Sequence, residues 1–226
     1  MAAVFVLAAG LASPAGAQVT LQHTFTFRYW GSAFYFGNPP PATYQYNQPG
    51  WGFSYRGDAR NSPWSLTFNY DGVSAPGQFW ERAAMWNVNA HRRVPNIPNG
   101  QVSVFLGYGS ATLSNTVGGQ GGTSSGFRLG ADARFNLGPQ AAGWYVTGEA
   151  AWGPSWDNTF AAFPAFANGP TTEYKIALGR GFGPNASAQI GWRSFNWSIP
   201  TSPGCGTSPG CQLRWSGWTL EVVTRR

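Results

Sequence analysis

The sequence predicts an all-β protein whose strands close into an antiparallel, up-and-down transmembrane β-barrel of ten strands, with eight strands as the alternative. Three observations support this fold class. Charged residues are only 10% of the 226 residues, against roughly 25% in ordinary soluble domains. Aromatic residues reach 16%. Apolar and polar residues alternate along one segment after another, and no segment follows the period of a helix.

The N-terminal segment has the features of a secretory signal peptide. An apolar stretch over 2–12 leads into Ala15-Gly16-Ala17, whose small side chains suit a cleavage site. We therefore expect 1–17 to be a signal peptide and 18–226 to be a single barrel domain. The alternative is that this apolar stretch packs as a buried helix or strand. Beyond it no apolar run is long enough for a transmembrane helix.

Alternation with a period of two predicts five strands in the first half of the chain, at about 20–30, 50–58, 63–70, 79–91 and 101–109. One face of each strand is rich in apolar residues, and the other is mostly small or polar. The apolar faces comprise Phe25, Phe27, Tyr29, Trp51, Phe53, Tyr55, Trp64, Leu66, Phe68, Tyr70, Ala84, Trp86, Val88, Ala90, Val102, Val104, Leu106 and Tyr108. In a barrel the apolar face contacts lipid and the polar face lines the lumen.

The second half continues in the same way, with strands at about 126–137, 143–152, 172–179, 186–198 and 212–223. Their apolar faces comprise Phe127, Leu129, Ala131, Ala133, Phe135, Trp144, Val146, Trp152, Tyr174, Ile176, Leu178, Ala188, Ile190, Trp192, Trp218, Leu220 and Val222. In the ninth strand we expect the alternation to change phase near Phe195, at a β-bulge.

The links between these strands alternate in length. Those after strands one, five, seven and nine have about 14–20 residues, and those after strands two, four, six and eight about 6–9, as in barrels with long external loops and short periplasmic turns. This pattern predicts that both termini face the periplasm. It places His23 and His91 on the periplasmic side, and Asp71 and Asp157 outside.

In its faces and links the chain resembles the small bacterial outer-membrane β-barrel superfamily, which includes eight-stranded structural barrels and ten-stranded omptin-like barrels. The resemblance covers nearly all of 18–226 and rests on pattern rather than on a diagnostic motif. It implies a location in the cell outer membrane and contact with membrane lipids. One departure is the C-terminal sequence Val222-Val-Thr-Arg-Arg226, because such barrels usually end on an aromatic residue.

Ionisable residues fall on the inward faces of the expected strands. A Lys or Arg on the lipid face near the midplane would cost roughly 2–4 kcal/mol, so we expect these residues to pair inside the lumen. A turn centred near Gly183 would place Glu173 opposite Arg193. The expected lumen network comprises Arg28, Asp132, Arg134, Glu149, Glu173, Lys175, Arg193 and Glu221, with Arg56 and Arg128 on the same face. The alternative to a structural network is the selectivity lining of a narrow pore.

Tryptophans near strand ends predict aromatic girdles at the two membrane interfaces, where an amphipathic ring has one edge in water. The expected members are Trp30, Trp51, Trp64, Trp80, Trp144, Trp152, Trp197 and Trp215. A platform for stacking on carbohydrate is the alternative.

The remaining candidates for chemistry are few. Cys205 and Cys211 are close in a Gly/Pro-rich segment and predict a disulfide after export, since a metal site would need more ligands nearby. In the superfamily that the chain resembles, enzymes need a histidine beside an acid or serine near the outer rim, and both histidines here are expected on the other side. We therefore expect no catalytic, cofactor-binding or metal-binding residues. The net charge of +6 does not predict a nucleic-acid partner, because the chain is exported.

These features favour a non-enzymatic, integral outer-membrane barrel with a structural or surface-interaction role, whose loops could contact an extracellular ligand. A narrow channel for small solutes is the second hypothesis, because ten strands leave little lumen once side chains fill it. A soluble, secreted carbohydrate-binding β-protein is the third. The sequence does not indicate an oligomeric state.

Overall fold

The structure is a computed structural model that describes residues 21–37, 44–78, 80–114, 121–138, 143–158, 168–199 and 211–226. Its strands are β1 (Leu21–Gly37), β2 (Tyr44–Asn47), β3 (Gly50–Ala59), β4 (Trp64–Ser74), β5 (Arg82–Val94), β6 (Gly100–Ser114), β7 (Gly121–Asn136), β8 (Trp144–Asn158), β9 (Gly169–Gly181), β10 (Ala186–Ile199) and β11 (Cys211–Arg225). In the described part of the chain, no helix is long and apolar enough to cross a membrane. The predicted signal peptide, 1–17, lies outside the described residues and stays a prediction.

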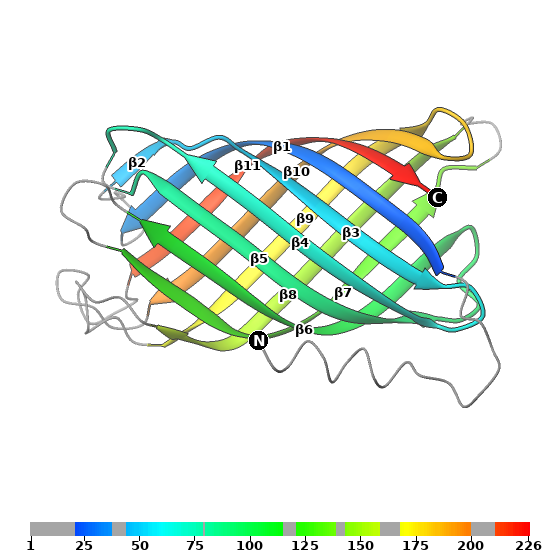
Figure 1. Ribbon diagram of the computed structural model, residues 1–226, viewed down its shortest axis with the longest axis horizontal. Helices are drawn as coiled ribbons and strands as arrows, with labels where there is room; N and C mark the ends of the chain where they lie inside the picture. Colours follow the sequence, from blue (N-terminus) through cyan, green and yellow to red (C-terminus); the bar gives the residue numbers. More distant parts are fainter. Residues whose placement is uncertain are drawn as a thin grey trace.

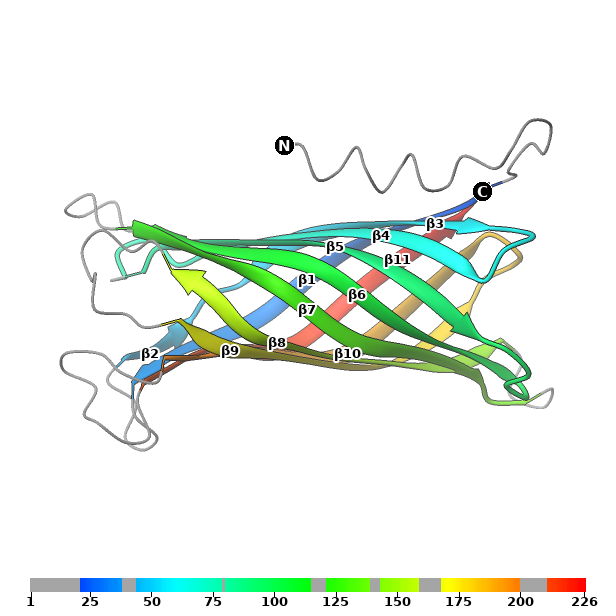
Figure 2. The same cartoon turned by 90° about the horizontal axis from the view of Figure 1, so that it is seen from below.

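The sheet closes on itself, because every strand from β3 onward pairs antiparallel with the next and β11 pairs with β1 (Figures 1 and 2). Both β2 and β3 pair with β1, β2 beside 33–36 and β3 beside 21–30, so together they fill one position in the wall. The wall therefore has ten strand positions. This confirms the predicted fold and excludes the eight-stranded alternative. Closure pairs both edges of every long described strand from β3 to β11, as a hydrocarbon environment requires.

The two ends of the barrel differ in their connections. The short turns 60–63, 95–99 and 182–185 lie at the end where β1 begins and β11 finishes (Figure 1). There the backbones of His23 and Arg226 exchange two hydrogen bonds of 2.8 and 2.9 Å. We call this the inner end, since short turns face the periplasm in outer-membrane barrels, and the opposite end the outer end. Most strands run further toward the outer end than the alternation predicted, which shortens the expected loops, whereas β5 begins at Arg82 rather than 79.

The outward face of the wall is an apolar band. Along β1, for example, Phe25 and Phe27 are exposed whereas Thr26 and Arg28 are buried. The charged side chains on the outward face of the described strands all lie toward strand ends, and they are Arg82, Arg92, Asp157, Arg180 and Arg214. A soluble protein would not expose such a continuous apolar surface, so the band is the surface that contacts lipid.

Aromatic residues mark the margins of this band. Near the inner end, Trp64 lies directly opposite Arg92 and Trp144 directly opposite Arg180, each arginine within 6 Å of the ring. Toward the outer end, outward-facing aromatic rings encircle the wall; they are Tyr29, Trp51, Tyr70, Trp86, Tyr108, Phe127, Trp152, Tyr174, Trp192 and Trp218. Four of the tryptophans expected in a girdle, Trp51, Trp64, Trp144 and Trp152, thus face outward.

The other four expected girdle members do not. Trp30, Trp80, Trp197 and Trp215 are at most 1% exposed and lie inside the barrel, so their assignment to an exterior girdle was wrong. The expected bulge near Phe195 is also absent, because β10 pairs with β9 and β11 in continuous register there. Both errors have one cause: the outer half of the lumen is lined by aromatic residues. Apolar side chains near strand ends were therefore read as facing lipid.

The lipid-facing band predicts a depth-dependent cost of charge. Ile176 faces outward midway between the aromatic margins, opposite Gly148 on β8. Ile176→Arg is expected to lower the free energy of unfolding by roughly 2–4 kcal/mol, measured by denaturant titration in lipid vesicles. Val146→Arg, nearer the inner end, is expected to cost less, and the lumen-facing change Thr147→Ser almost nothing. Equal costs for all three would contradict the assignment of the faces.

Candidate functional site

The lumen has three layers along the barrel axis. The outer layer is an aromatic cluster, the middle layer is a network of ion pairs, and the inner layer is an open vestibule of about 570 Å³. The vestibule is lined by Arg28, Glu149, Lys175 and Glu221 of the network, which form its floor. The described lumen is therefore open toward the inner end and filled toward the outer end.

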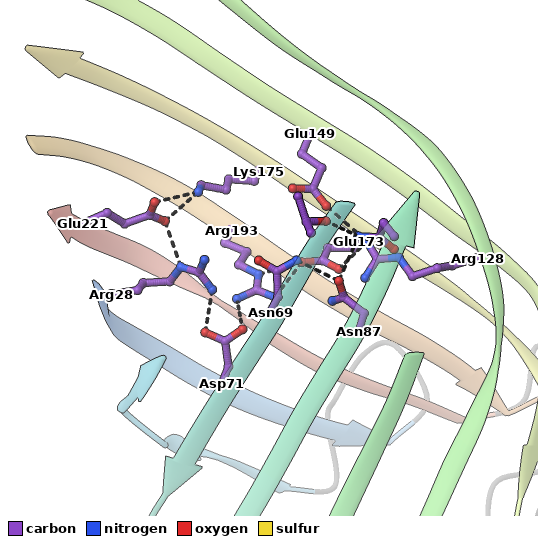
Figure 3. Close-up of polar contacts among 12 residues, drawn as sticks. Arg28, Asn69, Asp71, Asn87, Arg128, Glu149, Glu173, Lys175, Arg193 and Glu221 are labelled. Carbon is purple, nitrogen blue, oxygen red and sulfur yellow. Dashed lines mark hydrogen bonds and ion pairs between the residues drawn. The ribbon is translucent and has the colours of Figure 1, made fainter. Parts of the chain in front are cut away.

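Asp71 holds the centre of the ion-pair layer (Figure 3). Its carboxylate lies 2.6 Å from Nη1 of Arg28 through one oxygen and 2.6 Å from Nη1 of Arg193 through the other. Arg193 also contacts Glu173 through Nε at 2.8 Å and Nη2 at 2.6 Å. These residues come from β1, β4, β9 and β10 and are nearly inaccessible to solvent. The layer thus joins strands on opposite sides of the barrel.

The layer continues in two directions from this centre. Toward β11, Glu221 accepts a hydrogen bond from Nε of Arg28 at 2.9 Å and another from Nζ of Lys175 at 2.8 Å. Toward β7, Nη2 of Arg128 lies 3.0 Å from Glu173 and 3.2 Å from Glu149. The cations Arg28, Arg128, Lys175 and Arg193 are matched by the carboxylates Asp71, Glu149, Glu173 and Glu221. The layer is electrically neutral, as buried charges must be to avoid a large desolvation cost.

The structure brings together six residues of the expected network, Arg28, Glu149, Glu173, Lys175, Arg193 and Glu221. The expected register was wrong, however. Arg193 lies opposite Lys175 rather than Glu173, because Gly181 pairs with Ser187 and the turn is centred on Pro184 instead of Gly183. An offset of two residues preserves the face, so the long side chains still meet diagonally.

Asp71 was expected outside the barrel, and this expectation was wrong. The predicted strand stopped at Tyr70, but β4 runs to Ser74 and Asp71 continues the inward series of Thr67 and Asn69. The alternation beyond Tyr70 was the signal in the sequence that could have found it. Asp157, in contrast, is exposed near the outer end of β8, as expected, where its carboxylate accepts a hydrogen bond from Asn168.

The aromatic cluster fills the outer layer. Its buried members are Trp30, Phe34, Val73, Trp80, Ala83, Met85, Ala111, Leu113, Trp156, Phe195, Trp197, Leu213 and Trp215. Gln48, fully buried between β2 and β3, organises it: Nε2 donates to the Trp80 carbonyl at 2.8 Å, and Oε1 accepts from Nε1 of Trp215 at 2.7 Å. Tyr46, on β2 beyond the apolar band, donates to the same carbonyl at 2.9 Å. Burial raises the pKa of the Tyr46 hydroxyl to about 12, so it stays protonated.

Close contacts link the aromatic cluster to the wall and to the ion-pair layer. The Arg193 guanidinium lies over the Trp30 ring, 4.7 Å from its centroid. Trp156 enters the lumen where the pairing of β8 with β9 shifts between Gly153 and Trp156. Gly126 and Gly153 make this possible, because a β-carbon at either position would lie within 2.6 Å of the indole ring. The outer layer is therefore packed like a protein core.

Asp132 and Arg134, the other two residues of the expected network, lie closer to the inner end. Asp132 accepts from Arg56 at 3.2 Å and lies 2.6 Å from Nδ1 of His91. Nε2 of His91 lies 2.8 Å from the Thr67 hydroxyl, so His91 bridges an acid and a hydroxyl when Nδ1 carries the proton. His91 is in the inner half, as expected, but its pairing with an acid was not foreseen. Arg134 stacks on Tyr145, 3.6 Å from the ring centroid.

Two further kinds of site were considered in the sequence, a metal site and a disulfide. Among them, no group of three or more His, Cys, Asp or Glu side chains could bind a metal ion. The predicted disulfide lies outside the described residues, since neither Cys205 nor the side chain of Cys211 is among them.

The disulfide therefore stays a prediction. Mass spectrometry of non-reduced protein is expected to show Cys205 joined to Cys211. Alkylation of both thiols without reductant would contradict it. Because the closed loop is short, Cys205→Ser is expected to cost at most a few kcal/mol and to leave the barrel intact.

Comparison with known proteins starts from this geometry. No family model matches the sequence, and no curated protein sequence does. Among solved structures, the outer membrane protease OmpT of Escherichia coli superposes with a TM-score of 0.57 at 9% identity, over 94% of this chain and 99% of that one. Its fold is that of the outer-membrane β-barrels.

More distant barrels also superpose. An outer membrane channel from Pseudomonas putida F1 gives a TM-score of 0.46 at 11% identity, over 95% of this chain and 100% of that one. The attachment invasion locus protein Ail of Yersinia pestis gives 0.39 at 10% identity, over 91% and 98%. The fold shared with OmpT and the apolar outer wall agree with the predicted location in the cell outer membrane. The resemblance stated from sequence pattern is confirmed at the level of fold.

Proposed function

We propose that this chain is a closed, non-enzymatic barrel of the outer membrane, with a structural role and with a capacity to present its external loops to ligands at the cell surface. One observation carries the proposal: two consecutive layers, one aromatic and one of paired charges, fill the lumen between the outer end and the vestibule. A solute would have to displace both layers to cross.

Each layer opposes passage for a different reason. The aromatic cluster is mostly apolar, and the amide of Gln48 within it is already bonded to Trp80 and Trp215, so an ion would find little there to replace its water. Trp30 and Trp215 leave no exposed surface in this layer. In the ion-pair layer every carboxylate already has a cationic partner, so a passing ion would have to break contacts between buried charges. These obstacles act in series, which favours a closed barrel over a narrow channel.

Conductance in a planar lipid bilayer tests the proposal. Protein whose folding has been verified by heat-modifiable gel migration is expected to give no discrete current steps above the lipid baseline. Reproducible steps from the unmodified protein would contradict the closed barrel and would support the alternative, a narrow channel for small solutes. The vestibule would then be the inner entrance of that channel.

A hydrolase is the second candidate, and the order Thr67–His91–Asp132 is the observation that favours it. The arrangement matches a hydroxyl, a base and an orienting acid. We favour a structural role because Thr67 and His91 are both buried, and Asn89 also approaches the Thr67 hydroxyl at 3.4 Å. Release of p-nitrophenol from short-chain esters, lost in His91→Ala, would overturn the non-enzymatic assignment. Activity no greater than that of His91→Ala would support it.

A further inference from the structure

We propose that the vestibule is a binding site for a small organic anion that carries phosphate or carboxylate groups and enters from the periplasm. The cavity is lined by residues of the inner end, and its floor is the ion-pair layer. Its volume of about 570 Å³ lies within the range of roughly 300–1,000 Å³ that is usual for small-molecule sites. The proposal goes beyond a structural role, because it assigns a ligand to the open part of the barrel.

The charges that line the vestibule are unbalanced. Its carboxylates are all occupied: Asp58 lies 3.0 Å from Arg56, which also binds Asp132, and Glu149 and Glu221 bind cations of the ion-pair layer. Two arginines that line the vestibule have no carboxylate partner among the described residues. Within the described residues, neither Arg134 nor Arg225 has a carboxylate within ion-pair distance, although both line the cavity.

These two arginines act on each other. They come from β7 and β11 and line the same cavity, where two like charges without a carboxylate between them repel each other. Both are half-buried, so water screens this repulsion less than it would at an open surface. An anion bound between them would relieve the repulsion and supply the missing negative charge.

Neighbouring residues position the Arg134 guanidinium for contact with a bound anion. Its guanidinium lies over the Tyr145 ring, with Cζ 3.6 Å from the ring centroid, and the Tyr145 hydroxyl donates a hydrogen bond of 2.9 Å to Ser187. Stacking on one face leaves the N–H groups at the edge of the guanidinium free to form two parallel bonds to a carboxylate or phosphate. Gln101 lies opposite Arg134 on β6, and it also lines the cavity with a polar side chain.

Isothermal titration calorimetry with pyrophosphate and with citrate tests the site, using the full-length folded protein in a non-ionic detergent and a buffer of constant ionic strength. At least one probe is expected to bind saturably, with an affinity reduced tenfold or more in Arg134→Gln and in Arg225→Gln. Arg92→Gln and Arg180→Gln are matched controls on the outer wall, and they should leave the affinity unchanged. Arg134→Lys keeps the positive charge but loses the paired N–H donors of the guanidinium, so this variant should retain part of the affinity for the probe.

The outcomes are distinct. Absence of saturable binding of both probes would overturn the proposal, as would equal affinities in the wild-type protein and the two vestibule variants. Each variant is first checked for heat-modifiable migration, and the Arg225→Gln substitution at the end of β11 provides a second route if Arg134→Gln does not fold. Because binding is measured in detergent, current steps in a bilayer would contradict the closed barrel without affecting this result.

Discussion

Arg193→Gln is expected to lower the free energy of unfolding by about 3–5 kcal/mol, the cost typical of removing one partner from a buried ion pair. Arg193 is 3% exposed and is shared between Asp71 and Glu173 at 2.6 Å. Loss of the guanidinium leaves one carboxylate oxygen of Asp71 and one of Glu173 without a cationic partner. Both carboxylates are buried, so water does not replace the guanidinium. Equilibrium denaturation in lipid vesicles measures the effect.

A double-mutant cycle with Glu173 separates pairing from other causes. Glu173→Gln alone is also expected to destabilise, whereas the double variant should cost less than the sum of the two, by about 0.5–3 kcal/mol. Arg180→Gln is the control, because this arginine is exposed and should change stability by no more than about 0.5 kcal/mol. If the changes in the free energy of unfolding were strictly additive, the contact between Arg193 and Glu173 would not contribute to stability.

The aromatic cluster leads to the second large effect. Trp215→Ala is expected to cost about 3–5 kcal/mol, because the indole is fully buried and its loss leaves a cavity in a packed layer. The same substitution removes the donor to Gln48, so a buried amide oxygen also loses its partner. Equilibrium denaturation is again the measurement.

Trp192→Ala is the matched control, since Trp192 is 53% exposed on the outer wall and lipid can fill the space that it leaves. A cost as large as that of Trp215→Ala would contradict the distinction between lumen and lipid face. Because the ion-pair layer remains beneath, Trp215→Ala alone should not conduct. Conductance is expected only when it is combined with Arg193→Gln.

Much of the fold could be predicted because each strand that separates lipid from the lumen must carry apolar residues on one face and polar residues on the other. A strand between lipid and lumen must alternate, so Phe25 and Phe27 could be assigned to one face and Thr26 and Arg28 to the other without knowledge of their neighbours. The same parity already placed Trp30 inward, beside Arg28. The assignment of Trp30 to a girdle was wrong because tryptophan also packs in the filled outer half of the lumen, so residue type does not identify the face.

The candidate site could be predicted only in part. Inward charges had to be paired, since unpaired charges in a barrel are costly, and this requirement identified Arg28, Glu173, Arg193 and Glu221. It identified one pair, Glu173 with Arg193, although in the wrong register, and it did not identify the other partners. Asp71 lies beyond the strand expected at 63–70, because β4 continues to Ser74. The contact between His91 and Asp132 joins β5 to β7, which are not adjacent in the wall.

The sequence by itself therefore determined the ten long strands and most of their faces, because both depend on local alternation. The short strand β2 and the inward faces of Trp30, Trp197 and Trp215 were not among them. Only the tertiary structure decided which side chains meet across the lumen. Asp71 and Arg193 are 122 residues apart, and they come together only after ten strand positions have closed with one particular register. The filled outer half and the open inner half of the lumen follow from that closure, since it fixes the axial level at which each inward side chain lies.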